Sequence, residues 1–188
     1  YMAKKPGVKI TVQGGVSGAG VTSVGMNIVD IGAASRPVKD GEFKKYPDLK
    51  VYQIGGSAVV LICSDDLTLT DVTRDDIKNA YENGIFEGTL ASVTTAYARA
   101  EASGTQETFL EWLGDKNLKL HDNIKGATGN AGVLAAVAKA DGAIGFVDFG
   151  YTDGAEGIKI VDLADYEPAT SKTIAKALAG EDTYPNGL

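Results

Sequence analysis

Hydrophobic positions recur along the chain with two periods, one typical of strands and one typical of helices. Apolar or alternating runs predict strands at residues 8–12, 27–31, 51–54, 58–63, 94–98, 143–147 and 158–161. Helical spacing together with start and stop residues predicts helices at residues 17–25, 73–84, 103–113, 131–139 and 170–179. Strands that alternate with helices indicate an α/β fold with mostly parallel sheets, in which ligands lie at the carboxyl ends of strands.

Size and charge narrow the possible functions. With 188 residues, 44% of them hydrophobic, the chain can form one large domain or two small lobes. The 25 acidic side chains outnumber the 18 basic ones, and the net charge of −7 argues against nucleic acid or an anionic membrane as the main partner. No apolar run approaches the ~20 residues of a membrane span. Cys63 is the only cysteine, which excludes an internal disulfide and a cysteine-based metal site.

Two turns rich in glycine and serine have the composition of oxyanion sites. Arg99, one of three arginines, precedes Ser103, Gly104 and Thr105 at the start of a predicted helix. A helix start presents unpaired N–H groups and a partial positive charge, and an arginine can add a forked pair of bonds. The second turn, residues 14–20, follows a predicted strand and precedes another predicted helix.

A simpler interpretation of each turn stays open at this point. Ser103 can serve only as a helix cap, with Arg99 a surface arginine. The glycines of the turn at residues 14–20 can serve only to allow a positive φ.

Other chemistries find less support. Neither turn ends in the Gly-Lys-Ser/Thr of a phosphate-binding loop, and Ser23 stands where a dinucleotide fingerprint needs its third glycine. No Gly-x-Ser-x-Gly elbow follows a strand, and His121 is the only histidine. We therefore predict no catalytic residues, no metal site and no cofactor, and we expect a protein that is not an enzyme.

Four separated blocks, residues 8–20, 29–37, 99–105 and 126–151, resemble the phosphate-binding proteins that serve phosphate ABC transporters. The resemblance implies a type II periplasmic-binding-protein fold, with two α/β lobes joined by crossing strands. It implies a first lobe formed by residues 1–55 and 147–188 and a second lobe formed by residues 56–146. The chain would then be truncated at both ends, because such proteins begin with a further strand and loop and continue beyond residue 188.

The resemblance also implies a set of ligand-binding residues: Ser17, Gly18, Ser35, Arg36, Arg99, Glu101, Ser103, Gly104 and Thr105. Two of them depart from the usual pattern. Arg36 stands where many phosphate binders carry an aspartate that accepts a proton from the ligand, so it would either favour a fully deprotonated anion or face solvent. Glu101 is then the candidate proton acceptor, and its carboxylate would repel sulfate.

The function implied is an extracytoplasmic receptor, periplasmic or at the cell surface, that captures phosphate between its lobes and delivers it to an ABC transporter permease. A membrane anchor would belong to the full-length precursor. Two alternatives remain: a receptor for another tetrahedral oxyanion such as tungstate, molybdate or sulfate, and an interaction or sensor module of the same fold that has no transport role.

Overall fold

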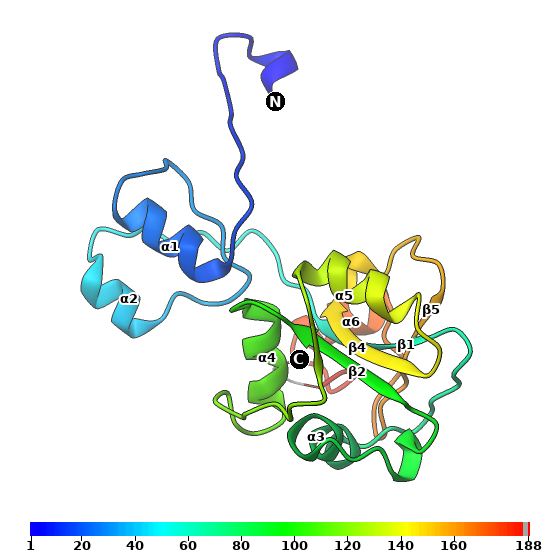
Figure 1. Ribbon diagram of the computed structural model, residues 1–188. Coiled ribbons are helices and arrows are strands. Elements are labelled where there is room, and N and C mark those ends of the chain that lie inside the picture. The colour runs from blue at the N-terminus through cyan, green and yellow to red at the C-terminus, as the bar shows by residue number, and fades with distance from the viewer. Residues whose placement is uncertain (186–187) are drawn as a thin grey trace. The chain divides into compact units, whose positions relative to one another are not determined.

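The computed structural model of the chain describes residues 1–185 and 188 (Figure 1). They divide into two compact units, Tyr1–Val51 and Tyr52–Leu188. The division lies close to the predicted lobe boundary after residue 55. Residues 147–188 belong to the second compact unit in this structure, and the assignment of lobes to residues 1–55, 56–146 and 147–188 stays a prediction.

The regular secondary structure of the first unit is helical. It contains a short 3-10 helix, η1 (Met2–Lys4), and two α-helices, α1 (Ser17–Gly25) and α2 (Asp40–Lys45). The predicted helix at residues 17–25 is confirmed at both ends. Gly25 is required there, because any Cβ at this position would overlap the ring of Tyr46. Helix α2 was not predicted, because its short polar sequence carries no apolar stripe.

Three predicted strands in residues 8–12, 27–31 and 51–54 are wrong. None of these segments pairs with a strand in the described part of the chain. Val12, Ile31 and Ile54 are 86%, 87% and 100% exposed, so the apolar side chains that suggested strands have no sheet to face. Alternation of apolar residues indicates a strand only where a partner strand exists.

A five-stranded mixed sheet organises the second unit, in the order β3-β2-β4-β1-β5. Its strands are β1 (Val59–Ser64), β2 (Thr95–Arg99), β3 (Lys125–Ala127), β4 (Ala143–Asp148) and β5 (Ile158–Ile160). Strand β2 runs parallel to β3 and β4, whereas β1 runs antiparallel to β4 and β5. The α/β class is confirmed, but the sheet is mixed and not mostly parallel, because a buried apolar run does not encode the direction of its strand.

The helices of the second unit begin at the residues that the sequence marks as caps. They are α3 (Arg74–Asn83), α4 (Gly104–Trp112), α5 (Gly129–Val137) and α6 (Ser171–Leu178), with two 3-10 turns, η2 (Gly88–Leu90) and η3 (Phe149–Tyr151). The Thr73 hydroxyl accepts a hydrogen bond from the Asp76 N–H, and Gly84 ends α3 with a φ of 69°. All four predicted helices of this unit are confirmed.

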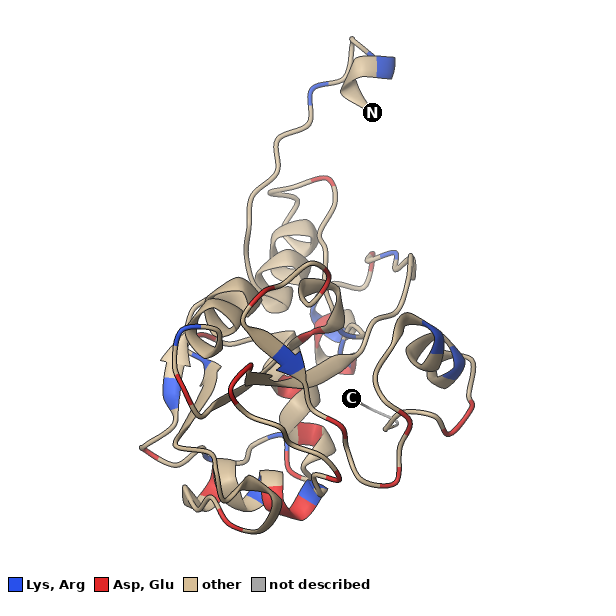
Figure 2. Ribbon diagram, turned by 90° about the vertical axis from the view of Figure 1, so that its right-hand side faces the viewer, with Lys and Arg blue, Asp and Glu red and all other residues tan. Residues whose placement is uncertain are grey.

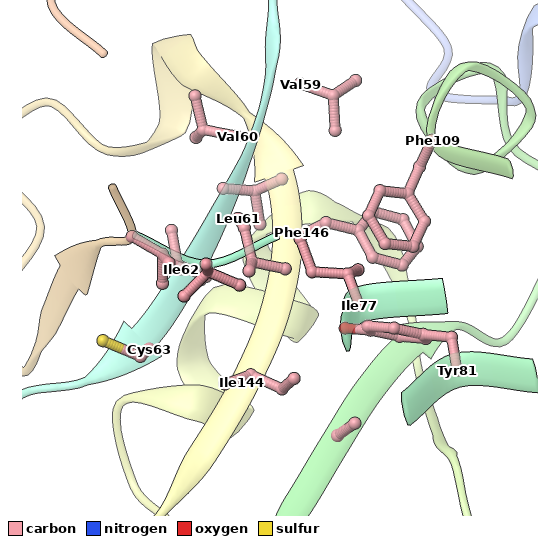
Figure 3. Close-up of a cluster of buried hydrophobic side chains, with 14 of the residues drawn as sticks. Val59, Val60, Leu61, Ile62, Cys63, Ile77, Tyr81, Phe109, Ile144 and Phe146 are labelled. Atoms are coloured by element: carbon pink, nitrogen blue, oxygen red, sulfur yellow. The ribbon is translucent and has the colours of Figure 1, made fainter. Parts of the chain in front are cut away.

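An aromatic cluster packs beside the central strand β4 (Figure 3). The ring of Phe146, from β4, stacks on that of Phe109 from α4 with centroids 4.0 Å apart, and Tyr81 from α3 meets Phe109 edge-on at 4.9 Å. Helices α3 and α4 therefore cover one face of the sheet. On the other face, Gly145 of β4 lies against Val133 and Val137 of α5.

The approach of α5 to the sheet gives a stability test. A methyl group added at Gly145 would lie 2.8 Å from Val133 Cγ1 and 2.9 Å from Val137 Cγ2. We expect Gly145→Ala to lower the free energy of unfolding by about 1–3 kcal/mol, as overpacking usually does. Urea unfolding followed by Trp112 fluorescence measures the change. The matched control is Gly132→Ala. Gly132 lies on α5, the helix that Gly145 contacts, and a Cβ added there would have its nearest neighbour at 3.7 Å, so this variant should not lose stability. Equal midpoints for the two variants would contradict the packing described here.

Candidate functional site

Arg99 is the last residue of β2 and lies at an edge of the sheet where parallel strands end. Because β2 runs parallel to β3 and β4, the carboxyl ends of these three strands share one edge, the usual ligand-binding edge of α/β sheets. The Arg99 N–H donates to Gln106 Oε1 of α4 at 3.0 Å, which ties the strand end to the helix. The Arg99 side chain is only 10% exposed, so the interpretation of Arg99 as a surface arginine is wrong.

Glu101 holds the Arg99 guanidinium. Its Oε1 accepts hydrogen bonds from Arg99 Nε at 2.8 Å and from Arg99 Nη2. The same oxygen accepts a third bond, at 3.1 Å, from the N–H of Gly129, the first residue of α5. The other carboxylate oxygen, Oε2, is buried and has no hydrogen-bond partner among the described residues. The pair therefore leaves one acceptor available for a ligand.

The protonation state of Glu101 follows from these contacts. Burial acts to raise the pKa of Glu101, but the Arg99 guanidinium and the Gly129 N–H stabilise the carboxylate more strongly and lower the pKa below its ordinary value. Glu101 is therefore ionised at neutral pH and can only accept hydrogen bonds.

The start of α4 supplies donors. Ser103 is the N-cap, and its hydroxyl accepts from the Gln106 N–H at 3.4 Å, so the capping role is confirmed. Gly104 and Thr105 are the first two helical residues, and their N–H groups have no partner within the part of the chain that the structure describes. Such amides at a helix start are the donors that bind anions. The cap leaves them available for that role.

In the first unit, Ser17 and Ser35 lie together although they are 18 positions apart in the sequence. Their hydroxyl oxygens are 3.1 Å apart, and the Ser35 N–H donates to Ser17 Oγ at 3.2 Å. Ser17 is the first residue of α1, so this pair also lies at a helix start. Gly18 follows it, and a Cβ on Gly18 would lie 3.9 Å from Arg36 Nη2. The four ligand-binding residues predicted in this unit are neighbours.

Glycines bring these residues together. Any Cβ on Gly20 of α1 would overlap the carbonyl oxygen of Ala33, and any Cβ on Gly32 would overlap that of Gly20. The helix and the loop therefore touch through their backbones, which only glycine allows. This contact brings the loop that carries Ser35 to the start of α1.

Arg36 is held by a carboxylate of its own unit. Its Nη1 and Nη2 donate to the two oxygens of Glu42, on α2, at 2.9 and 2.8 Å, and Nη1 also donates to the Pro37 carbonyl. The Lys39 N–H donates to the same carboxylate. The side chain of Arg36 is 10% exposed, so it does not face solvent. Its role toward an anion stays a prediction.

The structure adds residues that sequence reasoning missed. Gln106, Gly129 and Glu42 each position a predicted site residue. Gly129 lies in the cap, residues 128–130, that precedes the predicted helix at residues 131–139, but nothing in the sequence indicates its contact with Glu101. Its contact with Glu101 follows from β3, which pairs Ala127 with Arg99 and was not predicted.

Comparison with known proteins identifies the family. A family model described as a PBP superfamily domain matches residues 1–186. The chain belongs to the PBP superfamily. This PBP-superfamily chain is 28% identical over 158 residues to the phosphate-binding protein PstS of Bacillus subtilis (strain 168), covering 80% of the chain and 51% of that protein. It therefore spans about half the length of this curated relative.

Solved structures agree with the PBP fold. A protein from Clostridium perfringens, described as a phosphate ABC transporter substrate-binding protein and solved with bound phosphate, matches with a TM-score of 0.80 and 26% identity. That match covers 94% of this chain and 72% of the other. An ABC-type phosphate transport receptor from Vibrio cholerae matches in fold, with a TM-score of 0.69 and 20% identity over 95% of this chain and 74% of that chain.

Two other kinds of site are absent from residues 1–185 and 188. No group of three or more His, Cys, Asp or Glu residues there could hold a metal ion. None of the helices in that range has the length and apolar character needed to cross a membrane.

The Arg36–Glu42 ion pair leads to a testable prediction about the pKa of Glu42. The hydrogen bonds from Arg36 lower the pKa of Glu42 to about 2, although burial opposes this shift. A lowered pKa in the folded state stabilises the fold above the ordinary value of 4.5, and this contribution is lost as the pH falls from 4.5 toward 2. NMR titration of the Glu42 carboxyl carbon should give a midpoint near 2. In Arg36→Gln the midpoint should rise toward the ordinary value, and an unchanged midpoint would contradict the pairing.

Proposed function

We propose that this chain is a non-enzymatic receptor for phosphate that acts outside the cell membrane and passes phosphate to an ABC transporter permease. Phosphate would bind to Arg99, Glu101, Ser103, Gly104 and Thr105 at the start of α4. Ser17, Gly18, Ser35 and Arg36 of the first unit are the further ligand-binding residues that the family resemblance implies.

The donors at the start of α4 support an anion ligand. Each hydrogen bond to a charged group contributes roughly 1.5–3 kcal/mol, and micromolar binding needs about 8 kcal/mol net. Arg99 alone is too weak, since association itself costs at least about 4 kcal/mol. The unpaired N–H groups of Gly104 and Thr105 would supply additional bonds.

The unpaired oxygen of Glu101, Oε2, is the observation that favours phosphate over sulfate as the ligand. Phosphate keeps at least one proton at neutral pH and can donate it to a carboxylate, whereas sulfate has none to donate. Glu101 Oε2 is a buried acceptor without a partner in the described chain, and Glu101 is ionised. A protonated oxyanion satisfies that oxygen, and a fully deprotonated one is repelled by it.

The relatives support the same ligand and the same partner. The Clostridium perfringens protein was solved with phosphate, and the Bacillus subtilis relative is a phosphate-binding protein. Transport by an ABC permease, and a location outside the membrane, are the roles in which such binding proteins act. The site residues bind and orient a ligand, and no nucleophile or general base is assigned among them.

Thermal melting with different anions tests the proposal. Phosphate at 1,000 times its dissociation constant stabilises the folded state by about 4 kcal/mol, which raises the melting midpoint by several degrees. Sulfate should have little effect. A shift with tungstate but not phosphate would favour a receptor for another oxyanion, and no shift with any anion would favour an interaction or sensor module.

Arginine variants locate the site within the same assay. Arg99→Ala should abolish the phosphate-induced shift in melting midpoint. The change removes the guanidinium and leaves Glu101 as an uncompensated negative charge. Arg74→Ala, at the start of α3, is the matched control and should keep the full shift. A phosphate shift that survives Arg99→Ala would exclude this site.

Discrimination between phosphate and sulfate should depend on Glu101. Glu101→Gln replaces the acceptor with an amide that can also donate, so the preference for phosphate over sulfate should fall by about tenfold or more. Isothermal titration calorimetry with each anion measures the ratio of dissociation constants. Glu111→Gln makes the same exchange at an exposed position of α4 away from the helix start and serves as the control. An unchanged ratio in Glu101→Gln would mean that another residue selects the anion.

A further inference from the structure

The second unit contains a cavity at the end of α4, away from the anion donors at the start of that helix. Its volume is about 200 Å³, and its walls come from the start of α3, the end of α4 and the loop after β5. Gly104 begins α4 and Trp112 ends it, so the helix places Trp112 about 12 Å from Gly104. This α4-end cavity is therefore distinct from the candidate anion site.

Backbone pairing and core packing hold the walls of the α4-end cavity in place. Val72, just before α3, forms a parallel bridge with Leu163, and the Ala164 N–H donates to the Val72 carbonyl at 2.9 Å. Val72 and Leu163 are both buried. Trp112 packs on Phe109 of the aromatic cluster, with ring centroids 6.2 Å apart. The cavity is preformed, so a ligand would not have to order it.

Arg74, on the wall of this cavity, has no partner for its guanidinium. The other two arginines, Arg36 and Arg99, are paired with Glu42 and Glu101. The Arg74 side chain is exposed, and it forms no hydrogen bond or ion pair within residues 1–185 and 188. All five of its N–H donors are therefore available to a ligand.

The missing partner does not reflect a shortage of carboxylates. Residues 1–51 contain 8 of the 18 basic and 4 of the 25 acidic residues, which leaves 10 basic and 21 acidic residues in the second unit. Figure 2 shows the acidic residues, in red, over many loops and helices. Asp165 lines the same cavity and Asp75 follows Arg74 in the sequence, yet neither forms an ion pair with it. The arrangement keeps a cation unpaired in an acidic unit.

The guanidinium lies close to the aromatic side of the cavity. A Cβ added to Gly114, two positions after Trp112, would lie 2.8 Å from Arg74 Nη2, so Arg74 reaches from the start of α3 to the turn after α4. The negative end of the α4 dipole attracts it there. Trp112 and Tyr166 are half-buried, and the indole N–H and the phenol hydroxyl form no hydrogen bond within the described chain.

This lining selects among ligands. A guanidinium fork matches the two oxygens of a carboxylate, and aromatic side chains pack against a flat apolar body. Asp165 adds a carboxylate to the lining, which disfavours an ion with two negative charges. The volume of about 200 Å³ lies below the roughly 300–1,000 Å³ of pockets for larger ligands, so the ligand is small.

We propose that the α4-end cavity is a second ligand site, which binds a small aromatic monocarboxylate. Its carboxylate binds the Arg74 guanidinium, and its ring packs against Trp112 and Tyr166. The site uses none of the residues assigned to the anion. It is therefore independent of the proposed function, and a phosphate receptor or a module without a transport role could equally carry it.

Benzoate is the probe for this site. Trp112 is the only tryptophan, so its fluorescence reports binding at the cavity. We expect a saturable change with a dissociation constant on the order of 1 mM, because one charged contact and one ring offset only part of the cost of association. Benzamide has the same ring without the charge and should bind at least about tenfold more weakly. Phosphate should not displace benzoate.

Three results of this titration would overturn the proposal: no saturable change with benzoate, equal binding of benzamide, or displacement of benzoate by phosphate. The last would place benzoate in the anion site. A failure of phosphate to bind anywhere would count against the proposed function and leave the benzoate result unaffected.

Variants of two cations on α3 test the assignment to Arg74. Arg74→Gln should weaken benzoate binding by about tenfold or more, measured by isothermal titration calorimetry. Lys78→Gln removes a charge of the same sign one turn along the helix, where Lys78 pairs with Glu82 outside the cavity, and should keep the affinity. An unchanged affinity in Arg74→Gln, or an equal loss in both variants, would show that Arg74 does not hold the carboxylate. Circular dichroism shows whether both variants remain folded.

Discussion

The geometry of the candidate site in the second unit depends on one oxygen atom, Oε1 of Glu101. This atom accepts hydrogen bonds from two nitrogens of Arg99 and from the N–H of Gly129, and so joins the end of β2 to the start of α5. A buried ion pair gains little free energy beyond the cost of desolvating its charges, so its value here is geometric. It fixes the direction of the guanidinium and leaves Oε2 as a free acceptor.

The aromatic cluster positions the donors that complete this arrangement. Phe109 anchors α4 against Phe146 of β4, while the Tyr81 hydroxyl donates to the carbonyl of Tyr97 in β2 at 3.1 Å. Burial raises the pKa of Tyr81 above its ordinary value, so the hydroxyl stays a donor. The strand end that carries Arg99 and the helix start that carries Gly104 are therefore attached to the same packed core, and their separation cannot change freely.

Sequence reasoning succeeded where the signal was local. The cap at Thr73, the left-handed stop at Gly84 and the cap at Ser103 each act within a few residues, so their helices could be predicted with correct ends. It failed where the outcome depends on a distant partner. Residues 8–12 alternate as a strand does but lack a sheet, whereas β3 has no strand-like sequence and forms because β2 lies beside it. In the site, Arg99 and Ser103 were visible in the sequence, while Gly129 and Glu42 became apparent only through pairing and folding.

The two groups of predicted ligand-binding residues are held by different forces. Those of the second unit rest on a buried core and a sheet, whereas Ser17 and Ser35 are held by backbone contact at glycines and by the Arg36–Glu42 pair nearby. Contacts of the second kind bury little apolar area and are exposed to changes in pH and salt, so they open at a lower free-energy cost. A ligand of the first unit would therefore gain less than its hydrogen bonds alone suggest, because part of their free energy would be spent on ordering that unit. Any partner that buries the apolar segments of the first unit would lower that cost, and anion affinity would then rise without a new contact to the anion.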